Sequence, residues 1–175
     1  DLVNDLSRNI LLKKLSVSNF RHELQKINRG QRYSTSVTLL FSALGAASFT
    51  ILFGGNIKDF ISAFIIGFII KLLTIKGSDM NINQFFINSL TGGIAAFLAL
   101  VFVKINLATN LDQTIISSIM LLVPGLAITN AIRDTIAGDL LSGLTRAAEA
   151  FLIAVSIAVG TGAVLSFWIS YIGGI

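Results

Sequence analysis

The sequence predicts an all-α integral membrane protein with five transmembrane helices, and three observations support this prediction. Hydrophobic residues make up 54% of the 175 residues. Charged residues make up only 13%, against roughly 25% in ordinary soluble domains, and the mean hydropathy is +0.82. Uncharged intervals also recur along the chain, most of them at or above the roughly 20 residues that a helix needs to cross a hydrocarbon core.

The first 32 residues predict a separate cytoplasmic or interfacial segment, followed by a transmembrane transport domain over 33–175. Apolar residues recur at three- and four-residue intervals from Leu2 to Leu15, as in a short amphipathic helix. A second short helix is expected from Ser18 to Asn28, because serine is a favourable helix cap.

The five predicted spans follow from the intervals between charged residues. The second interval is the shortest and the fifth is the longest, and Trp168 and Tyr171 near the end of the fifth favour a membrane interface. The spans are expected at 33–57, 60–75, 80–103, 113–132 and 150–175.

The basic residues predict the orientation of these spans. With the amino terminus in the cytoplasm, eleven of the thirteen basic residues lie inside, and only Lys58 and Lys104 lie outside. A basic amino-terminal segment also occurs in nucleic-acid-binding proteins, but ahead of membrane spans it is the usual orientation signal. We therefore expect a multi-pass protein of the cytoplasmic (inner) membrane, in contact with the lipid bilayer and not with nucleic acid.

Small residues at four-residue spacing predict a close helix contact on the last span. Residues of this kind let another helix approach closely, and Gly92 and Ala96 form a similar pair on the third span. We interpret both sets as packing surfaces. The ridge on the last span comprises Ala150, Ala154, Ala158, Gly162 and Ser166.

The only proline, Pro124, lies inside the predicted fourth span and predicts a broken or kinked helix there. Proline has no N–H to donate and its ring clashes with the preceding turn, and Gly125 adds backbone freedom. Broken membrane helices are tolerated where they line a cavity or are covered by protein, and in many transporters their ends hold the substrate. A plain kink without a ligand fits the sequence equally well.

Five ionisable residues follow this break and predict a transport path. Charges between apolar segments are functional candidates in a membrane protein, and here helical spacing places them in two stripes. Arg146 and Glu149 can pair directly at this spacing. Two positive against three negative charges leave one carboxylate for a substrate ammonium or a proton. The candidate path residues are Thr129, Asn130, Arg133, Asp134, Asp139, Ser142, Arg146 and Glu149.

The same stretch has a second interpretation as a cytoplasmic hairpin. The uncharged intervals before Arg133 and after Glu149 are each long enough to span the membrane alone. An arginine at the bilayer centre would cost about 3 kcal/mol or more. We therefore expect these residues at the inner boundary, where they line an inward-facing vestibule beside the broken helix.

A membrane enzyme is the rival class, because Asp134 and Asp139 could hold Mg²⁺ between phosphates. Such sites generally need more converging carboxylates than these two, and no histidine or Ser/Lys base accompanies them. Cysteine is absent, which excludes disulfides and thiolate metal sites. We expect no enzymatic activity, no metal and no cofactor.

A family resemblance is carried by the run VPGLAITNAIRDTIAGDLLSGLTRAAEAFLIAVSIAVG, from Val123 to Gly160. It resembles the threonine/serine exporter family in its amino-terminal membrane domain, and the similarity extends upstream through LFGGNIKDF to the amphipathic segment. The resemblance implies a secondary transporter of the cytoplasmic membrane that exports threonine, serine or, in some members, small dicarboxylates. Gly138 and all the path and break residues named above match the family pattern.

The resemblance sets the expected substrate and partners, and the charges of the stretch set our hypothesis for the residue roles. We expect export of L-threonine or L-serine by alternating access coupled to protons, with Arg133 or Arg146 on the substrate carboxylate. Asp134, Asp139 or Glu149 would take the ammonium or the proton. The family implies a cytoplasmic portion before Asp1 and a second five-helix unit, and a homo-oligomer is a further expectation. The alternatives are a subunit of a small-dicarboxylate exporter and a non-transporting scaffold subunit.

Overall fold

The computed structural model describes Ser18–Arg21, Leu24 and Tyr33–Gly173. The chain divides into two units, residues 1–37 and 38–175. In the first unit Ser18–Arg21 and Leu24 are helical. The amphipathic helix predicted near the amino terminus lies outside the described residues.

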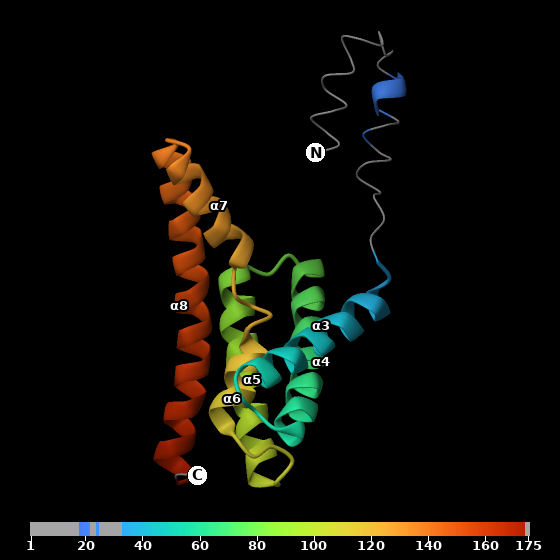
Figure 1. Cartoon of the computed structure of the whole chain (residues 1–175), viewed down its shortest axis with the longest axis vertical. Helices are drawn as coiled ribbons and strands as arrows, with labels where there is room; N and C mark the ends of the chain where they lie inside the picture. The colour runs from blue at the N-terminus through green and yellow to red at the C-terminus, as the bar shows by residue number, and fades with distance from the viewer. Residues whose placement is uncertain (1–17, 22–23, 25–32, 174–175) are drawn as a thin grey trace. The chain divides into compact units, whose positions relative to one another are not determined.

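Six helices occupy the chain from Thr35 to Tyr171, and no strand occurs among residues 33–173 (Figure 1). Four of them, α3, α4, α5 and α8, are long and apolar enough to cross a membrane. The helices are α3 (Thr35–Leu52), α4 (Ile57–Asp79), α5 (Gln84–Lys104), α6 (Leu111–Ile119), α7 (Gly125–Ile136) and α8 (Leu140–Tyr171).

The predicted fourth span is not a single helix in the structure. α6 ends at Ile119, α7 begins at Gly125, and Met120–Pro124 between them is not helical. The two helices have 9 and 12 residues, so they are roughly 14 and 18 Å long and neither crosses a membrane alone. The structure therefore has four candidate spans where the sequence predicted five.

Four of the helices that lead into a further helix are followed by a left-handed residue, which explains the short connections after them. Gly54, Asn81, Asn106 and Gly138 follow α3, α4, α5 and α7, with φ angles between 55° and 88°. Glycine and asparagine tolerate this conformation best, and it lets the next N–H groups bond to the last carbonyls of the helix. Each helix can therefore stop and reverse within a few residues.

Asp59 joins two loops at one end of the second unit. Its side chain is fully buried and accepts hydrogen bonds from the backbone N–H groups of Asn56, Thr109 and Asn110, at 3.0, 2.6 and 2.8 Å. The Asn110 side-chain amide donates a further bond at 2.8 Å. Asn110 is the N-cap residue of α6, but its side chain makes no capping bond there. The starts of α4 and α6 are thus tied together.

α5 packs beside α8 in the same direction. Gly160 meets the backbone of Ser89, and Phe97 lies edge-on to Trp168 with ring centroids 6.3 Å apart. Both contacts advance together along the two chains, which makes the helices parallel. The Lys104 ammonium, at the end of α5, lies 5.5 Å from the centre of the Trp168 ring.

The predicted small-residue ridge on α8 does not make this contact. Ala154, Ala158, Gly162 and Ser166 are exposed, and a side chain added at Gly162 would meet nothing within 4 Å. The face that approaches α5 instead centres on the buried Gly160. Spacing alone did not distinguish two faces of the helix that both carry small residues.

The core of the second unit lies among α4, α5, α6 and α8, while α3 runs across α4 (Figure 1). Gly67 of α4 allows this crossing, because a Cβ there would lie 2.6 Å from the Cβ of Ala46 on α3. The core residues are Ile66, Ile70, Ala95, Ala96, Ala99, Ile115, Leu122 and Ile157.

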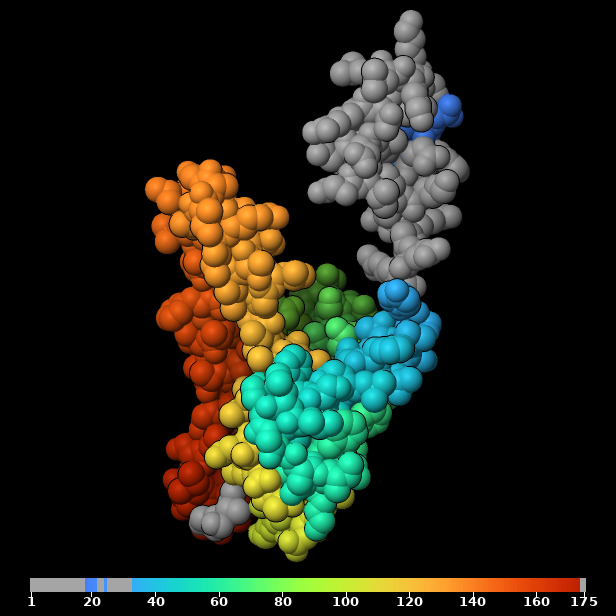
Figure 2. All heavy atoms as spheres, viewed as in Figure 1, coloured from blue at the N-terminus to red at the C-terminus, as the bar shows by residue number. Residues whose placement is uncertain are grey.

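α7 and the first half of α8 form a hairpin that projects beyond α4 and α5 (Figures 1 and 2). From the Ser89–Gly160 contact, α5 continues only to Gln84, whereas α8 continues back to Leu140. The difference corresponds to roughly 22 Å of helix. The hairpin thus stands outside the body formed by the long helices.

Candidate functional site

The turn of the hairpin is built by Gly138 and Asp139. Gly138 has φ +88°, and its N–H donates to the carbonyl of Thr135 at 3.1 Å. The N–H of Asp139 donates to the carbonyl of Asp134 at 2.9 Å, which completes a Schellman cap on α7. Asp139 then caps α8, because its carboxylate accepts from the N–H of Ser142 at 3.2 Å.

The two helices of the hairpin touch near this turn and separate away from it. A Cβ on Gly143 of α8 would overlap the hydroxyl of Thr135 and lie 3.1 Å from the carbonyl oxygen of Ala131. Gly143 is therefore the residue that allows α7 and α8 to approach. Ala131 and Ala150 are each 6% exposed and lie in the same contact region.

The charged residues of the hairpin centre on Asp134. The Arg146 Nε lies 2.9 Å from one oxygen of the Asp134 carboxylate, and an Arg133 Nη lies 3.5 Å from the other. The Asp134 side chain is 18% exposed, Arg146 46% and Arg133 70%. The Arg146–Glu149 pair that helical spacing allows is not formed, because Arg146 reaches across the hairpin to Asp134 on α7.

Asp139 is held in its ionised form. The hydroxyl of Ser142 donates to its carboxylate at 2.7 Å, in addition to the backbone N–H of the same residue. These two bonds lower the pKa of Asp139, with the hydroxyl bond the larger cause. A carboxylate of this kind stays negative at neutral pH, so it is better suited to hold a cation than to carry a proton.

The remaining predicted path residues are on the same hairpin. Thr129 is exposed and its hydroxyl donates to the carbonyl of Gly125 at 2.9 Å. Asn130 is half-buried. Glu149 is exposed and has no ion pair within the described residues. Among those residues no three His, Asp or Glu side chains form a group that could hold a metal ion.

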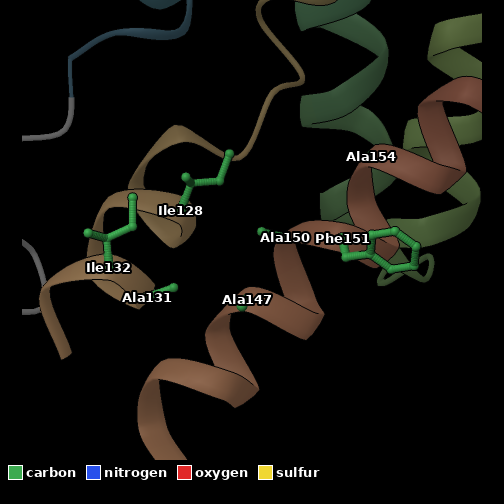
Figure 3. A pocket seen from close by; sticks show the side chains of 7 residues that line it. All are labelled: Ile128, Ala131, Ile132, Ala147, Ala150, Phe151 and Ala154. Carbon is green, nitrogen blue, oxygen red and sulfur yellow. The ribbon is translucent and has the colours of Figure 1, made fainter. Parts of the chain in front are cut away.

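An open apolar groove of about 300 Å³ lies between α7 and α8 where they separate (Figure 3). None of the eight predicted path residues lines it, and it offers no charged side chain to a hydrophilic solute. Its walls suit an apolar occupant. The lining residues are Ile128, Ala131, Ile132, Ala147, Ala150, Phe151 and Ala154.

The break between α6 and α7 lies deeper, beside the middle of α4. A Cβ on Gly67 would lie 3.3 Å from the side chain of Leu121, and Gly67 is near the centre of α4. Pro124 has φ −81° and ψ 58° and is the N-cap residue of α7. The N–H of Gly125 donates to the carbonyl of Val123 at 2.9 Å around it, as in an inverse γ-turn.

Two polar features of the helix body were not predicted as functional from the sequence. Thr114, Ser117 and Ser118 of α6 are fully buried just before the break, and each hydroxyl donates to the carbonyl four residues earlier. The second feature is Asp59. Its signal was present in the sequence, since Asn56 and Asp59 have the spacing of a capping box, and the structure forms that box.

Long apolar helices with short connections and a buried polar half-helix define a multi-pass α-helical membrane protein. A family model, ThrE, described as "Putative threonine/serine exporter", matches residues 1–168. The chain therefore belongs to this family of membrane transporters, which confirms the expected resemblance. No curated protein and no solved structure matches the chain.

Proposed function

We propose that the chain is a secondary transporter, or one half of one, that exports L-threonine or L-serine by alternating access coupled to protons. Family membership over residues 1–168 is the observation that carries this proposal. The half-helix α6, followed by the non-helical Met120–Pro124 beside the middle of α4, supports it, because transporters build their substrate sites at such interruptions.

The proposed orientation places the hairpin on the cytoplasmic side of the inner membrane. Basic residues favour that side, and both arginines of the second unit lie on the hairpin. The solute would enter beside the hairpin and then pass the interruption. The charged residues of the hairpin would therefore form the cytoplasmic entrance of the transport path.

The geometry suggests different roles for the two arginines. Arg133 is the more exposed, and its 3.5 Å contact with Asp134 is long, so a substrate carboxylate can replace Asp134 as its partner. Arg146 makes the shorter 2.9 Å contact and joins α8 to α7. In this proposal Arg133 binds the substrate carboxylate, while Arg146 holds Asp134 and the hairpin in position.

The three carboxylates of the hairpin also differ in whether they are free to bind the solute. Asp134 is engaged by both arginines, and Asp139 is held ionised by Ser142. Glu149 has no ion pair within the described residues and is available to a substrate ammonium or to the coupled proton. Thr129, Asn130 and Ser142 would add hydrogen bonds to the solute.

The test is flux through Arg146→Ala in vesicles, with labelled threonine and serine. We expect export to be abolished while membrane insertion is unchanged, since Asp134 loses its closer partner. Thr145→Ala is the matched control, because Thr145 is the exposed neighbour of Arg146 and is outside the proposed path. Normal flux through Arg146→Ala would remove this arginine from the mechanism.

The alternatives are separated in the same assay. Flux of a labelled small dicarboxylate, but not of threonine or serine, would favour the dicarboxylate exporter. The second five-helix unit expected for the family is added in a parallel reaction. Absence of flux for every solute, with and without that unit, would favour a non-transporting scaffold.

A further inference from the structure

Lys71 is a charged side chain inside the membrane-spanning part of α4. It is half-buried and makes no ion pair within the described residues. Lys58 and Lys76, near the two ends of the helix, are each nine residues from Gly67, so Gly67 lies near the middle of the membrane. A charge close to that depth is costly unless water or an anion reaches it, and it is a functional candidate by default.

The lipid headgroups are too far away to be the partner of Lys71. Its Cα lies one helical turn, roughly 6 Å, beyond Gly67 and therefore about 9 Å inside a hydrocarbon core of about 30 Å. The stem of a lysine side chain reaches only about 6 Å. Cβ atoms also point toward the N-terminus of a helix, which for Lys71 is the direction away from the nearer headgroups. Lys71 therefore needs a partner at its own depth in the membrane.

The interruption between α6 and α7 lies beside the same part of α4. A Cβ on Gly67 would lie 3.3 Å from the side chain of Leu121, which is the second residue of the non-helical Met120–Pro124. Lys71 follows Gly67 by four residues, so it lies one turn further along nearly the same face of α4. The chain after Leu121 leads the same way, since α7 runs to the hairpin beyond the end of α4 (Figure 1). Lys71 and the last residues of the interruption therefore lie at similar depths.

Polar groups continue from Lys71 toward the hairpin side of the membrane. Thr74 and Ser78 follow it on the same face of α4, and they are half-buried and exposed, respectively. At the interruption, the N–H groups of Leu126 and Ala127 have no acceptor within the described residues, so they depend on water or on a solute. These polar groups support an aqueous route from the hairpin to Lys71.

We propose that Lys71 binds the carboxylate of the transported solute at the interruption, after the solute has passed the hairpin. This inference rests on the proposed function, because it adds a binding residue to the same transport path. Threonine, serine and small dicarboxylates all carry a carboxylate, which pairs with an ammonium through charge-assisted hydrogen bonds. Each charge then compensates the other, which lowers the cost of holding either one inside the membrane.

A charge-rescue experiment tests this role, because the chain has no cysteine of its own. In vesicles, Lys71→Cys is expected to lower the flux of labelled threonine or serine at least several-fold. Aminoethyl methanethiosulfonate transfers an aminoethylthio group to the thiol and releases methanesulfinate, so it restores an ammonium at position 71. We expect this reagent to recover most of the flux, and methyl methanethiosulfonate, which adds no charge, to recover none.

Lys76→Cys is the matched control. Lys76 carries the same charge and is exposed on the same helix, and its spacing of five residues from Lys71 places it on a different face. Its flux should equal that of the unchanged chain, with and without either reagent. Mass spectrometry reports the modification of each thiol, and membrane insertion and thermal unfolding are measured for each variant.

Several results would overturn the inference. Undiminished flux through Lys71→Cys, or an equal loss through Lys76→Cys, would show that no specific role belongs to this ammonium. Equal recovery with both reagents would make side-chain size the cause. Recovery with neither, after complete modification, would leave Lys71 a structural role, and a thiol that neither reagent modifies would place the residue in lipid.

Failure of the proposed function is a separate result. The unchanged chain itself would then transport neither threonine nor serine, with or without the second five-helix unit, and the inference would fall with it. Transport by the unchanged chain together with full transport by Lys71→Cys would overturn the role of Lys71 alone.

Discussion

Asp59 shows how much a single buried carboxylate can organise in an apolar protein. Its two oxygens receive three backbone N–H groups and one side-chain amide, from α4's own cap and from the loop before α6. One buried side chain thus satisfies donors from two separate segments of the chain. The residue therefore fixes the position of the half-helix α6 relative to α4.

Asp59→Ala is expected to lower the free energy of unfolding by about 2–3 kcal/mol, because it leaves the Thr109 and Asn110 N–H groups without an acceptor. Thermal unfolding in detergent measures the loss. Asp112→Asn is the control, since Asp112 is exposed in the first turn of α6 and should change little. Equal effects of the two variants would show that the bonds to Asp59 do not hold the loop.

Asp139 provides a prediction about pH. Its lowered pKa means that the folded state binds this proton less tightly than the unfolded chain. Asp139 therefore stabilises the start of α8 at neutral pH, and this contribution is lost as the pH falls through its lowered pKa, below about pH 4. Ser142→Ala should raise the pKa toward the ordinary aspartate value and shrink the contribution at neutral pH.

A carboxyl titration by NMR, with labelled aspartate, checks this shift. Thr145→Ala serves as the control, because the Thr145 hydroxyl bonds to the Ser142 carbonyl and not to Asp139. An unchanged Asp139 titration in Ser142→Ala would show that the hydroxyl does not cause the lowered pKa.

Among the elements, α5 and α8 make the closest helix contact, and it depends on one glycine. The two helix backbones approach closely because Gly160 of α8 lies against the backbone of Ser89. On α5, Gly92 and Gly93 lie against the backbone of α8. Helices in membranes gain little from apolar burial against one another, so close backbone approach supplies much of their association.

Gly160→Ala is expected to destabilise the protein by about 1–3 kcal/mol, because its Cβ would overlap the Ser89 carbonyl and push the helices apart. Gly162→Ala is the matched control two residues away, where a Cβ meets nothing within 4 Å. Thermal unfolding in detergent should show a lowered melting temperature for Gly160→Ala and not for Gly162→Ala. A similar drop in both would mean that glycine acts through helix flexibility and not through this contact.

The interruption of the fourth span illustrates what local sequence can predict about an element. One proline inside an apolar run indicated that the helix could not continue unchanged. It did not indicate that helix would be lost from Met120 onward, four residues before the proline. Leu122 belongs to the core, so the start of the non-helical segment is set by tertiary packing and not by proline alone.

At the scale of the whole molecule, the loop after α5 and the α7–α8 hairpin lie at opposite ends of the helix bundle. The loop after α5 shares its end with the start of α4 through Asp59, and the hairpin projects from the other end. Ile105 is exposed at the end of α5, and Ala137 is exposed at the turn of the hairpin. Together they report the orientation that the basic residues predict.

Ala137→Cys and Ile105→Cys are expected to react with a membrane-impermeant thiol reagent from opposite sides. In intact cells Ile105→Cys should be labelled, while Ala137→Cys should require permeabilised cells, because its end carries the basic residues. The untouched chain, which has no cysteine, is the blank. Labelling of both variants in intact cells would contradict the arrangement.

The sequence by itself determined the membrane class and the approximate positions of the four helices long enough to span a membrane. Those properties depend on hydropathy over about 20 residues, which is a local property of the chain. Tertiary structure alone decided that Arg146 pairs with Asp134 and that α8 packs through Gly160. It also decided that the charged stretch stands on a projecting hairpin. These outcomes depend on how α7 and α5 lie against α8, and spacing along one helix carries no information about its neighbours.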